Sequence, residues 1–269
     1  MTALPLRYNP TMGHNNIKKQ FIDNQVRVFR EKEPDGAGLI NKHQIVLGMI
    51  HQFSKPSDRI LDVGCSDGKI LKELSGLRYR KLYGVDIQEW AKTSLTGTRI
   101  TYRDCDIENE PLPFTGKFDL IIISDVLEHM FSPQSVLYDL KKHLSPKGKI
   151  IFSVPNAGWF LNGVLLTFFP SKLFVSTAFG PWGHTHQFTF FELRKIASKL
   201  KYTIVELKGG KMDNYAFKQG IKKYLFDLFV WITLPLATRL PIIFSAHIFG
   251  VLENTSRVPS QRDRFDVGI

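Results

Sequence analysis

The stretch Arg59-Ile-Leu-Asp-Val-Gly-Cys-Ser-Asp-Gly-Lys69 joins a short apolar run to a turn that contains two glycines. The apolar run predicts a buried strand over 59–63. Past the turn, residues 69–77 predict a helix, because apolar side chains recur there at helical spacing: Ile70, Leu71, Leu74 and Leu77. A strand, a tight turn and a helix in this order predict the first unit of a doubly wound sheet.

The chain after this unit alternates in the same way. Phe118-Asp-Leu-Ile-Ile-Ile-Ser124 is an apolar run typical of a strand buried on both faces of a parallel sheet. Further strands are predicted at 81–86, 99–103, 149–154, 203–207 and 247–253, and helices at 88–95, 133–144 and 190–200. The pattern predicts the α/β class: a Rossmann-like, seven-strand, mostly parallel sheet with helices on both faces, a helical N-terminal cap and an apolar C-terminal insert.

The flanks of the alternating region differ from it in character. Helical patterns over 17–29 and 39–53 predict that the N-terminal part covers the sheet or a ligand cleft. The predicted divisions are a helical cap (1–58), an α/β domain (59–253) with a lid or substrate insert (155–187) and an apolar insert (224–246), and a mobile polar tail (254–269).

Composition and charge restrict the class of protein. The 269 residues carry 36 Lys+Arg against 25 Asp+Glu, a net charge of +11, with 43% hydrophobic and 23% charged residues, as in ordinary globular proteins. Two cysteines cannot form a disulfide framework, and no signal peptide is visible at the N-terminus. We therefore expect a cytoplasmic protein.

The excess positive charge is concentrated near the C-terminus. Residues 155–269 carry a net +7, whereas residues 59–154 carry +1. Nine cations lie within 194–223, directly before an apolar stretch of 19 residues, 228–246, that holds a single Arg. Pro235 and Pro241 disfavour one long helix there. Cations beside an apolar surface suit an anionic membrane better than a nucleic acid, so region 194–252 indicates peripheral binding at the inner face of a membrane. Two other interpretations of the apolar residues 224–252 stay open, a buried cap over the active site and a membrane span.

The glycine turn has several interpretations. It lacks two of the three glycines of a dinucleotide fingerprint and has the wrong spacing for a P-loop. Gly64-Cys-Ser-Asp-Gly68 does match the G-x-S-x-G elbow of serine hydrolases, with Ser66 as nucleophile. That fold needs several strands before its elbow, and the residues before Arg59 have a helical pattern. The hydrolase stays as an alternative.

Seven short motifs lie in order along the chain. They are Asp62-Val-Gly-Cys-Ser-Asp-Gly68, Gly84-Val-Asp-Ile87, Cys105-Asp-Ile-Glu108, Leu112-Pro-Phe114, Ser124-Asp-Val-Leu-Glu-His-Met130, Leu144-Ser-Pro-Lys-Gly148 and Ser153-Val-Pro-Asn156. Over about residues 40–207 this series resembles the class I S-adenosylmethionine-dependent methyltransferases. It is similar to the subgroup that includes quinone-biosynthesis O-methyltransferases and polysaccharide-cluster methyltransferases. Ser66 stands where the family usually has a glycine.

The resemblance implies S-adenosyl-L-methionine as cofactor and assigns residues to its parts. Asp86 would accept hydrogen bonds from the ribose hydroxyls, and Asp62 would counter the ammonium group. The implied cofactor-binding residues are Asp62, Gly64, Cys65 and Gly68 near the amino-acid end, Asp86 at the ribose, Ile87, Asp106 and Ile107 at the adenine, and Ser124 in the same cleft.

Three histidines are candidates for catalysis. His129 follows the strand 118–124, and His184 and His186 close the long insert. No third ligand accompanies His184 and His186 in the sequence, so no metal site is predicted. We expect methyl transfer to a small or lipid-linked acceptor, at a hydroxyl oxygen. The alternatives are the serine hydrolase and a non-catalytic, membrane-associated cofactor-binding module. Nucleic acid is not expected as a partner, and the oligomeric state is left open.

Overall fold

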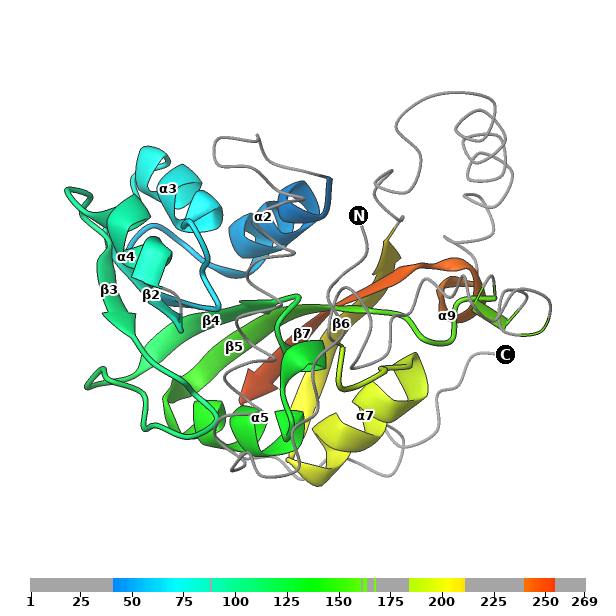
Figure 1. The fold of residues 1–269 in the computed structure, drawn as a ribbon. Coiled ribbons are helices and arrows are strands. Elements are labelled where there is room, and N and C mark those ends of the chain that lie inside the picture. Colours follow the sequence, from blue (N-terminus) through cyan, green and yellow to red (C-terminus); the bar gives the residue numbers. More distant parts are fainter. Residues whose placement is uncertain are drawn as a thin grey trace, which may run out of the picture.

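A computed structural model describes residues 41–87, 89–160, 162–163, 167, 184–210 and 240–254. The seven strands form one sheet in the order β3-β2-β1-β4-β5-β7-β6 (Figure 1), in which β7 alone runs antiparallel to its neighbours. The strands are β1 (Arg59–Val63), β2 (Lys81–Asp86), β3 (Thr101–Asp104), β4 (Phe118–Ser124), β5 (Leu144–Pro155), β6 (Tyr202–Gly210) and β7 (His247–Asn254). The predicted α/β fold with a seven-strand, mostly parallel sheet is confirmed, whereas most of the predicted N-terminal cap and of the apolar C-terminal insert lies outside the described residues.

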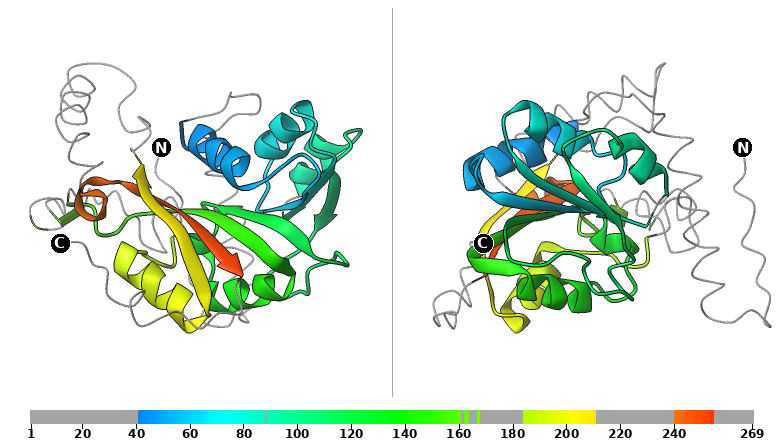
Figure 2. Two further views of the ribbon diagram at one scale, coloured as in Figure 1. Left: turned by 180° about the vertical axis from the view of Figure 1, so that it is seen from behind. Right: turned by 90° about the vertical axis from the view of Figure 1, so that its left-hand side faces the viewer.

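Helices cover both faces of the sheet (Figures 1 and 2). On one face lie α2 (Asn41–Phe53), α3 (Lys69–Gly76) and α4 (Glu89–Leu95); on the other lie α5 (Pro133–Lys142) and α7 (Phe190–Lys199). Short helical turns, η1 (Leu127–His129) and α9 (Pro241–Phe244), follow β4 and precede β7. The predicted helix over 39–53 corresponds to α2, whereas 17–29 lies outside the described residues.

The two faces of β4 explain its apolar sequence. Leu120 and Ile122 pack in the core beneath α2 and α3, while Ile121 and Ile123 pack in the core beneath α5 and α7. All four side chains are fully buried. Because successive strand residues point to opposite faces, a central strand covered on both sides needs apolar residues at nearly every position.

Several predicted boundaries differ from the structure, most of all the start of β5, expected at residue 149 and observed at Leu144. The helix expected over 133–144 ends at Lys142, and Leu144 already pairs with Phe118 as the first residue of β5. The amide of Phe118 donates to the carbonyl of His143 (2.8 Å) where the chain enters the sheet, and residues 145–148 already belong to β5. The sheet register shifts there, between Phe118 and Leu120. An irregular strand of this kind carries no periodic signal.

The inserts lie largely outside the described residues. This holds for most of 155–187, for 224–239 and for the tail beyond Asn254. The predicted last strand is confirmed as β7, so the chain returns to the sheet after the apolar insert. Among the residues that the structure describes, no helix is both long enough and apolar enough to cross a membrane.

The central position of β4 predicts a large cost for a cavity in it. We expect Ile122→Ala to lower the free energy of unfolding by about 2–5 kcal/mol, because the surrounding core cannot collapse around a fully buried site. Val205→Ala, on an exposed side chain of β6, is the control and should stay within about 0.5 kcal/mol of the parent. Chemical denaturation measures both, and equal losses would contradict the placement of the core.

Candidate functional site

The turn after β1 is tied to the end of β2 by its backbone. The amides of Gly64 and Cys65 both donate to the carbonyl of Val85, at 2.8 and 3.1 Å. The next amide, of Ser66, donates to the carboxylate of Asp86 at 2.8 Å. Three successive amides thus hold the turn over the carboxyl ends of the strands, where open α/β sheets bind ligands.

Both glycines of the turn are required by its shape. Gly64 has φ +71° and Gly68 has φ +74°, in the left-handed region that favours glycine. A Cβ at Gly64 would lie 2.4 Å from Val126, and one at Gly68 would lie 2.4 Å from Leu95. Both glycines therefore leave room for neighbouring side chains of the protein, and Gly64 also lines a pocket. Ser66, where the family usually has glycine, adopts a left-handed φ of +53°.

Two carboxylates meet at this edge. Asp62 and Asp86 retain only 4% and 9% of their surface, and both approach the turn, from β1 and β2 respectively. Burial, and then the charge of Asp86, raise the pKa of Asp62 well above its usual value. A pocket opens beside them, and its lining comes from α2, the β1–α3 turn and the end of β4: Lys42, His43, Asp62, Gly64, Cys65, Ser66, Asp67, Lys69, Ile70, Ser124, Asp125 and Val126.

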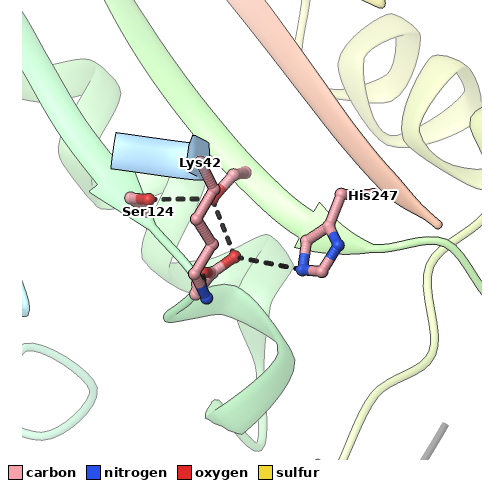
Figure 3. A network of polar contacts seen from close by, with 5 residues as sticks. Lys42, Ser124 and His247 are labelled. Atoms are coloured by element: carbon pink, nitrogen blue, oxygen red, sulfur yellow. Dashed lines mark hydrogen bonds and ion pairs between the residues drawn. The ribbon is translucent and has the colours of Figure 1, made fainter. Parts of the chain in front are cut away.

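A polar network lies at the end of β4, and three of its residues, Lys42, Ser124 and Asp125, line the pocket (Figure 3). Asp125 forms an ion pair with Lys42 and accepts from Ser153 at 2.8 Å, and His247 lies 4.0 Å from it. The hydroxyls of Ser153 and Ser124 are 2.8 Å apart. Burial opposes the ionisation of Asp125, but Lys42 and His247 hold its pKa below the usual range. Burial lowers the pKa of His247 to about 4.

This network was missed in the sequence. Asp125 follows β4 directly, so the rule that ligands bind at carboxyl strand ends could have found it. Lys42 and His247 come from α2 and from the start of β7, at opposite ends of the described chain (Figure 3). Only the folded sheet brings them together, and no local pattern marks them.

Two of the residues predicted near the adenine, Asp106 and Ile107, follow the end of β3. The amide of Cys105 donates to the carbonyl of Asp86 (3.0 Å), which places the following Asp106 beside the β2 end. The Asp106 carboxylate accepts from Asn109 at 2.7 Å and from the Glu108 amide at 3.2 Å. Ile107 packs against the core.

Two other predicted residues differ in exposure. The Ile87 side chain is exposed at the surface. Cys65 is buried, and a Cβ at Gly84 would lie 2.8 Å from its sulfur. Burial raises the pKa of the Cys65 thiol well above its usual value. A thiol held protonated in packed surroundings is suited to packing rather than to nucleophilic attack.

The candidate catalytic histidines separate into two groups. The rings of His129 and His184 lie with their centroids 5.0 Å apart, next to the buried Glu128. Burial, and then His129, lower the pKa of His184 to about 3. His186 instead uses its Nδ1–H to donate to the carbonyl of Met130 at 2.9 Å. His129 and His184 are therefore brought together, and His186 anchors the segment that carries them.

Comparison with known proteins identifies the domain. A model of the family described as "Methyltransferase domain" matches residues 39–207. The ubiquinone biosynthesis O-methyltransferase of Dechloromonas aromatica is 33% identical over 110 residues, covering 39% of this chain and 47% of that protein. The protein of the same name from Chromobacterium violaceum is 29% identical over 143 residues, covering 50% and 56%. The chain thus spans about half the length of these relatives.

Solved structures share the fold at low sequence identity. Magnesium protoporphyrin IX methyltransferase from Synechocystis, with bound S-adenosylhomocysteine, has a TM-score of 0.54 at 17% identity, covering 92% of this chain and all of that one. The 1,6-didemethyltoxoflavin-N1-methyltransferase of Burkholderia thailandensis, also with S-adenosylhomocysteine, has a TM-score of 0.56 at 15% identity, covering 94% of both chains.

The buried state of Asp62 predicts an unusual dependence of stability on pH. Its pKa is raised on folding, so the contribution of Asp62 to the stability of the unliganded protein is fully present below the carboxyl's ordinary pKa of ~3.9 and is lost as pH rises. Asp62→Asn removes this penalty. At pH 7 we expect its melting temperature to rise by a few degrees, where 1 kcal/mol corresponds to ~2–4 °C.

The exposed Asp139→Asn is the control and should leave the melting temperature at pH 7 nearly unchanged. Melting curves of both variants and the parent at pH 4 and pH 7 make the comparison. A lower melting temperature for Asp62→Asn at pH 7 would contradict the assigned pKa direction.

Proposed function

Because the chain belongs to the methyltransferase-domain family, we propose that it transfers a methyl group from S-adenosyl-L-methionine to a small or lipid-linked acceptor. The observation that carries the proposal is the pair of buried carboxylates, Asp62 and Asp86, under a glycine turn at the carboxyl edge of the sheet. Burying charge is costly unless a partner compensates it, and a cationic, hydroxyl-rich ligand is such a partner.

The chemical groups of S-adenosylmethionine fit the residues at this edge. Asp62 suits the ammonium group of its amino-acid end, and Asp86 suits the ribose hydroxyls, as an acidic residue does in dinucleotide sites. We propose that further residues contribute to the same site: Gly64, Cys65, Gly68, Ile87, Asp106, Ile107 and Ser124. When bound, the cofactor supplies an electrophilic methyl group on a sulfonium sulfur. The protein's part is to align that group with the acceptor and to exclude water.

We place the acceptor beside the end of β4 and propose a hydroxyl oxygen as the atom methylated. The relatives named above are called O-methyltransferases, which supports oxygen. A hydroxyl must lose its proton during transfer, and His129, His184 and His186 are the candidate groups at this end of the site. Burial lowers the pKa of His184 to about 3, which keeps its imidazole neutral and also makes it a weak proton acceptor.

The serine-hydrolase alternative finds less support. In the described chain α2 leads into β1 with no strand before it. The amide of Ser66 is held by Asp86, and neither His184 nor His186 lines the pocket that Ser66 lines. The second alternative, a cofactor-binding module without catalysis, would use the same pocket. Only a measurement of methyl transfer distinguishes it from an enzyme.

Calorimetric titration with S-adenosylmethionine tests the cofactor assignment. We expect the parent to bind one equivalent and Asp86→Ala to lose at least tenfold in affinity, about 1.4 kcal/mol, because the hydrogen bonds to the ribose are lost. Asp104→Ala is the matched control, because Asp104 is an exposed carboxylate at the end of β3, and this variant should bind like the parent. Undiminished affinity in Asp86→Ala would remove the assignment.

We also propose that the protein binds the surface of an anionic membrane. The outer face of α7 supports this, because Phe191 is 76% exposed and shares that face with Arg194, Lys195 and Lys199. Ile242 and Ile243, in α9, are also exposed, and both α9 and α7 contact β6. Exposed apolar side chains among cations suit an anionic bilayer surface.

Vesicle co-sedimentation tests the membrane proposal. Vesicles containing phosphatidylglycerol should bind the parent at low salt and release it at high salt, and pure phosphatidylcholine should bind weakly. The double change Arg194→Glu/Lys195→Glu should weaken binding at least tenfold, since each cation near the surface is worth about 1 kcal/mol. Leu77→Ala, an exposed apolar residue after α3 on the opposite face, is the control. Equal binding of both variants to anionic vesicles would contradict the proposal.

A further inference from the structure

Three side chains that can ligate a metal converge after β4. Glu128 and His129 lie in η1, and His184 comes from a segment 55 residues further along the chain. Their ligand atoms all lie within 4.8 Å of one another. The sequence predicted no metal site, because His184 and His186 had no third ligand. The structure pairs His184 with a different histidine and adds a carboxylate.

Two atoms of this cluster are buried without a hydrogen bond. Glu128 Oε2 and His184 Nδ1 each lack a partner within the described residues, and Glu128 is 98% buried, since it retains 2% of its surface. A buried polar group left unpaired costs about 1–3 kcal/mol. A cation coordinated by both atoms would remove that cost.

The backbone fixes the cluster independently of any ion. The amides of Thr185 and His186 both donate to the carbonyl of Glu128, at 2.8 and 3.0 Å. The hydroxyl of Thr185 donates to the carbonyl of Met130 at 2.6 Å. These bonds fasten the segment that carries His184 to the turn that carries the other two side chains. The three residues are thus held close together by hydrogen bonds that do not use their side chains.

The donor set identifies the class of ion. Two imidazoles and one carboxylate are the three protein ligands of many catalytic zinc sites, in which a fourth position stays open. Imidazole suits Zn²⁺ and its first-row neighbours, whereas Mg²⁺ and Ca²⁺ prefer oxygen. Coordination at ~2.0–2.2 Å requires the ligand atoms to draw together by about 1 Å, which side-chain rotation supplies.

We propose that Glu128, His129 and His184 bind one divalent transition-metal ion, Zn²⁺ by preference, with an open position for an acceptor oxygen. The cluster follows directly on Ser124, Asp125 and Val126, which line the pocket. An ion there would lower the pKa of a coordinated hydroxyl, in place of a histidine base. This role rests on the proposed methyl transfer, whereas the binding of the ion does not.

Metal titration of the full chain tests the inference. After removal of metals with a chelator, calorimetry with Zn²⁺ and visible absorption with Co²⁺ should each give one equivalent bound, with the intense Co²⁺ bands of a low-coordinate site. Glu128→Gln and His184→Gln, which come from separate segments, should each weaken binding at least tenfold, comparable to losses seen on disturbing metal sites. His51→Gln, an exposed histidine in α2, is the control for adventitious binding and should behave like the parent.

The melting temperature of each metal-free variant establishes that it is folded. Stoichiometric binding by the parent and His51→Gln, with loss in a folded variant of the cluster, supports the site. Absence of one-to-one binding by the parent, or parent-like binding by both cluster variants, overturns it. Titration of the metal-free chain with S-adenosylmethionine separates the two proposals: cofactor binding without metal binding removes only the metal site, and the reverse removes only the cofactor assignment.

Discussion

The carbonyl of Val85 accepts hydrogen bonds from the amides of both Gly64 and Cys65, and the shape of the site depends on this pair of bonds. This pair of hydrogen bonds folds the β1–α3 turn over the end of β2, and it brings Asp62 and Asp86 into one buried edge. The turn can do this only with positive φ at Gly64 and Gly68, where side chains would also collide with Val126 and Leu95. The pocket therefore depends on a backbone geometry that few sequences allow.

The carboxyl groups at this end of the sheet differ in what favours or opposes their ionisation. Asp125 is ionised by its contact with Lys42, which ties α2 to the end of β4. Burial instead raises the pKa of Asp62 and of Glu128 well above their usual values. A cation bound beside either group would stabilise its ionised form. We propose that the ammonium group of the cofactor pairs with Asp62 and that a metal ion is coordinated by Glu128. The bound ligands would then supply the positive charges that these two buried carboxyl groups lack.

The sequence predicted the parts of this structure that repeat locally. Apolar runs located β1, β2 and β4 to the residue, because a strand buried on both faces leaves a continuous signal. The start of β5 was missed, since its pairing with Phe118 depends on a bulge. The family resemblance pointed to Asp62 and Asp86. It could not find Lys42, His247 or the meeting of Glu128 with His184, because these contacts join segments that only the folded sheet brings together.

A crystal structure of the full chain with S-adenosylhomocysteine tests whether the cofactor binds at Asp62 and Asp86. We predict that the ribose hydroxyls donate to the carboxylate of Asp86 and that the amino group lies at Asp62, with the hydrogen bonds from the turn to Val85 intact. A nucleoside bound elsewhere, or bound here with no contact to Asp86, would contradict it.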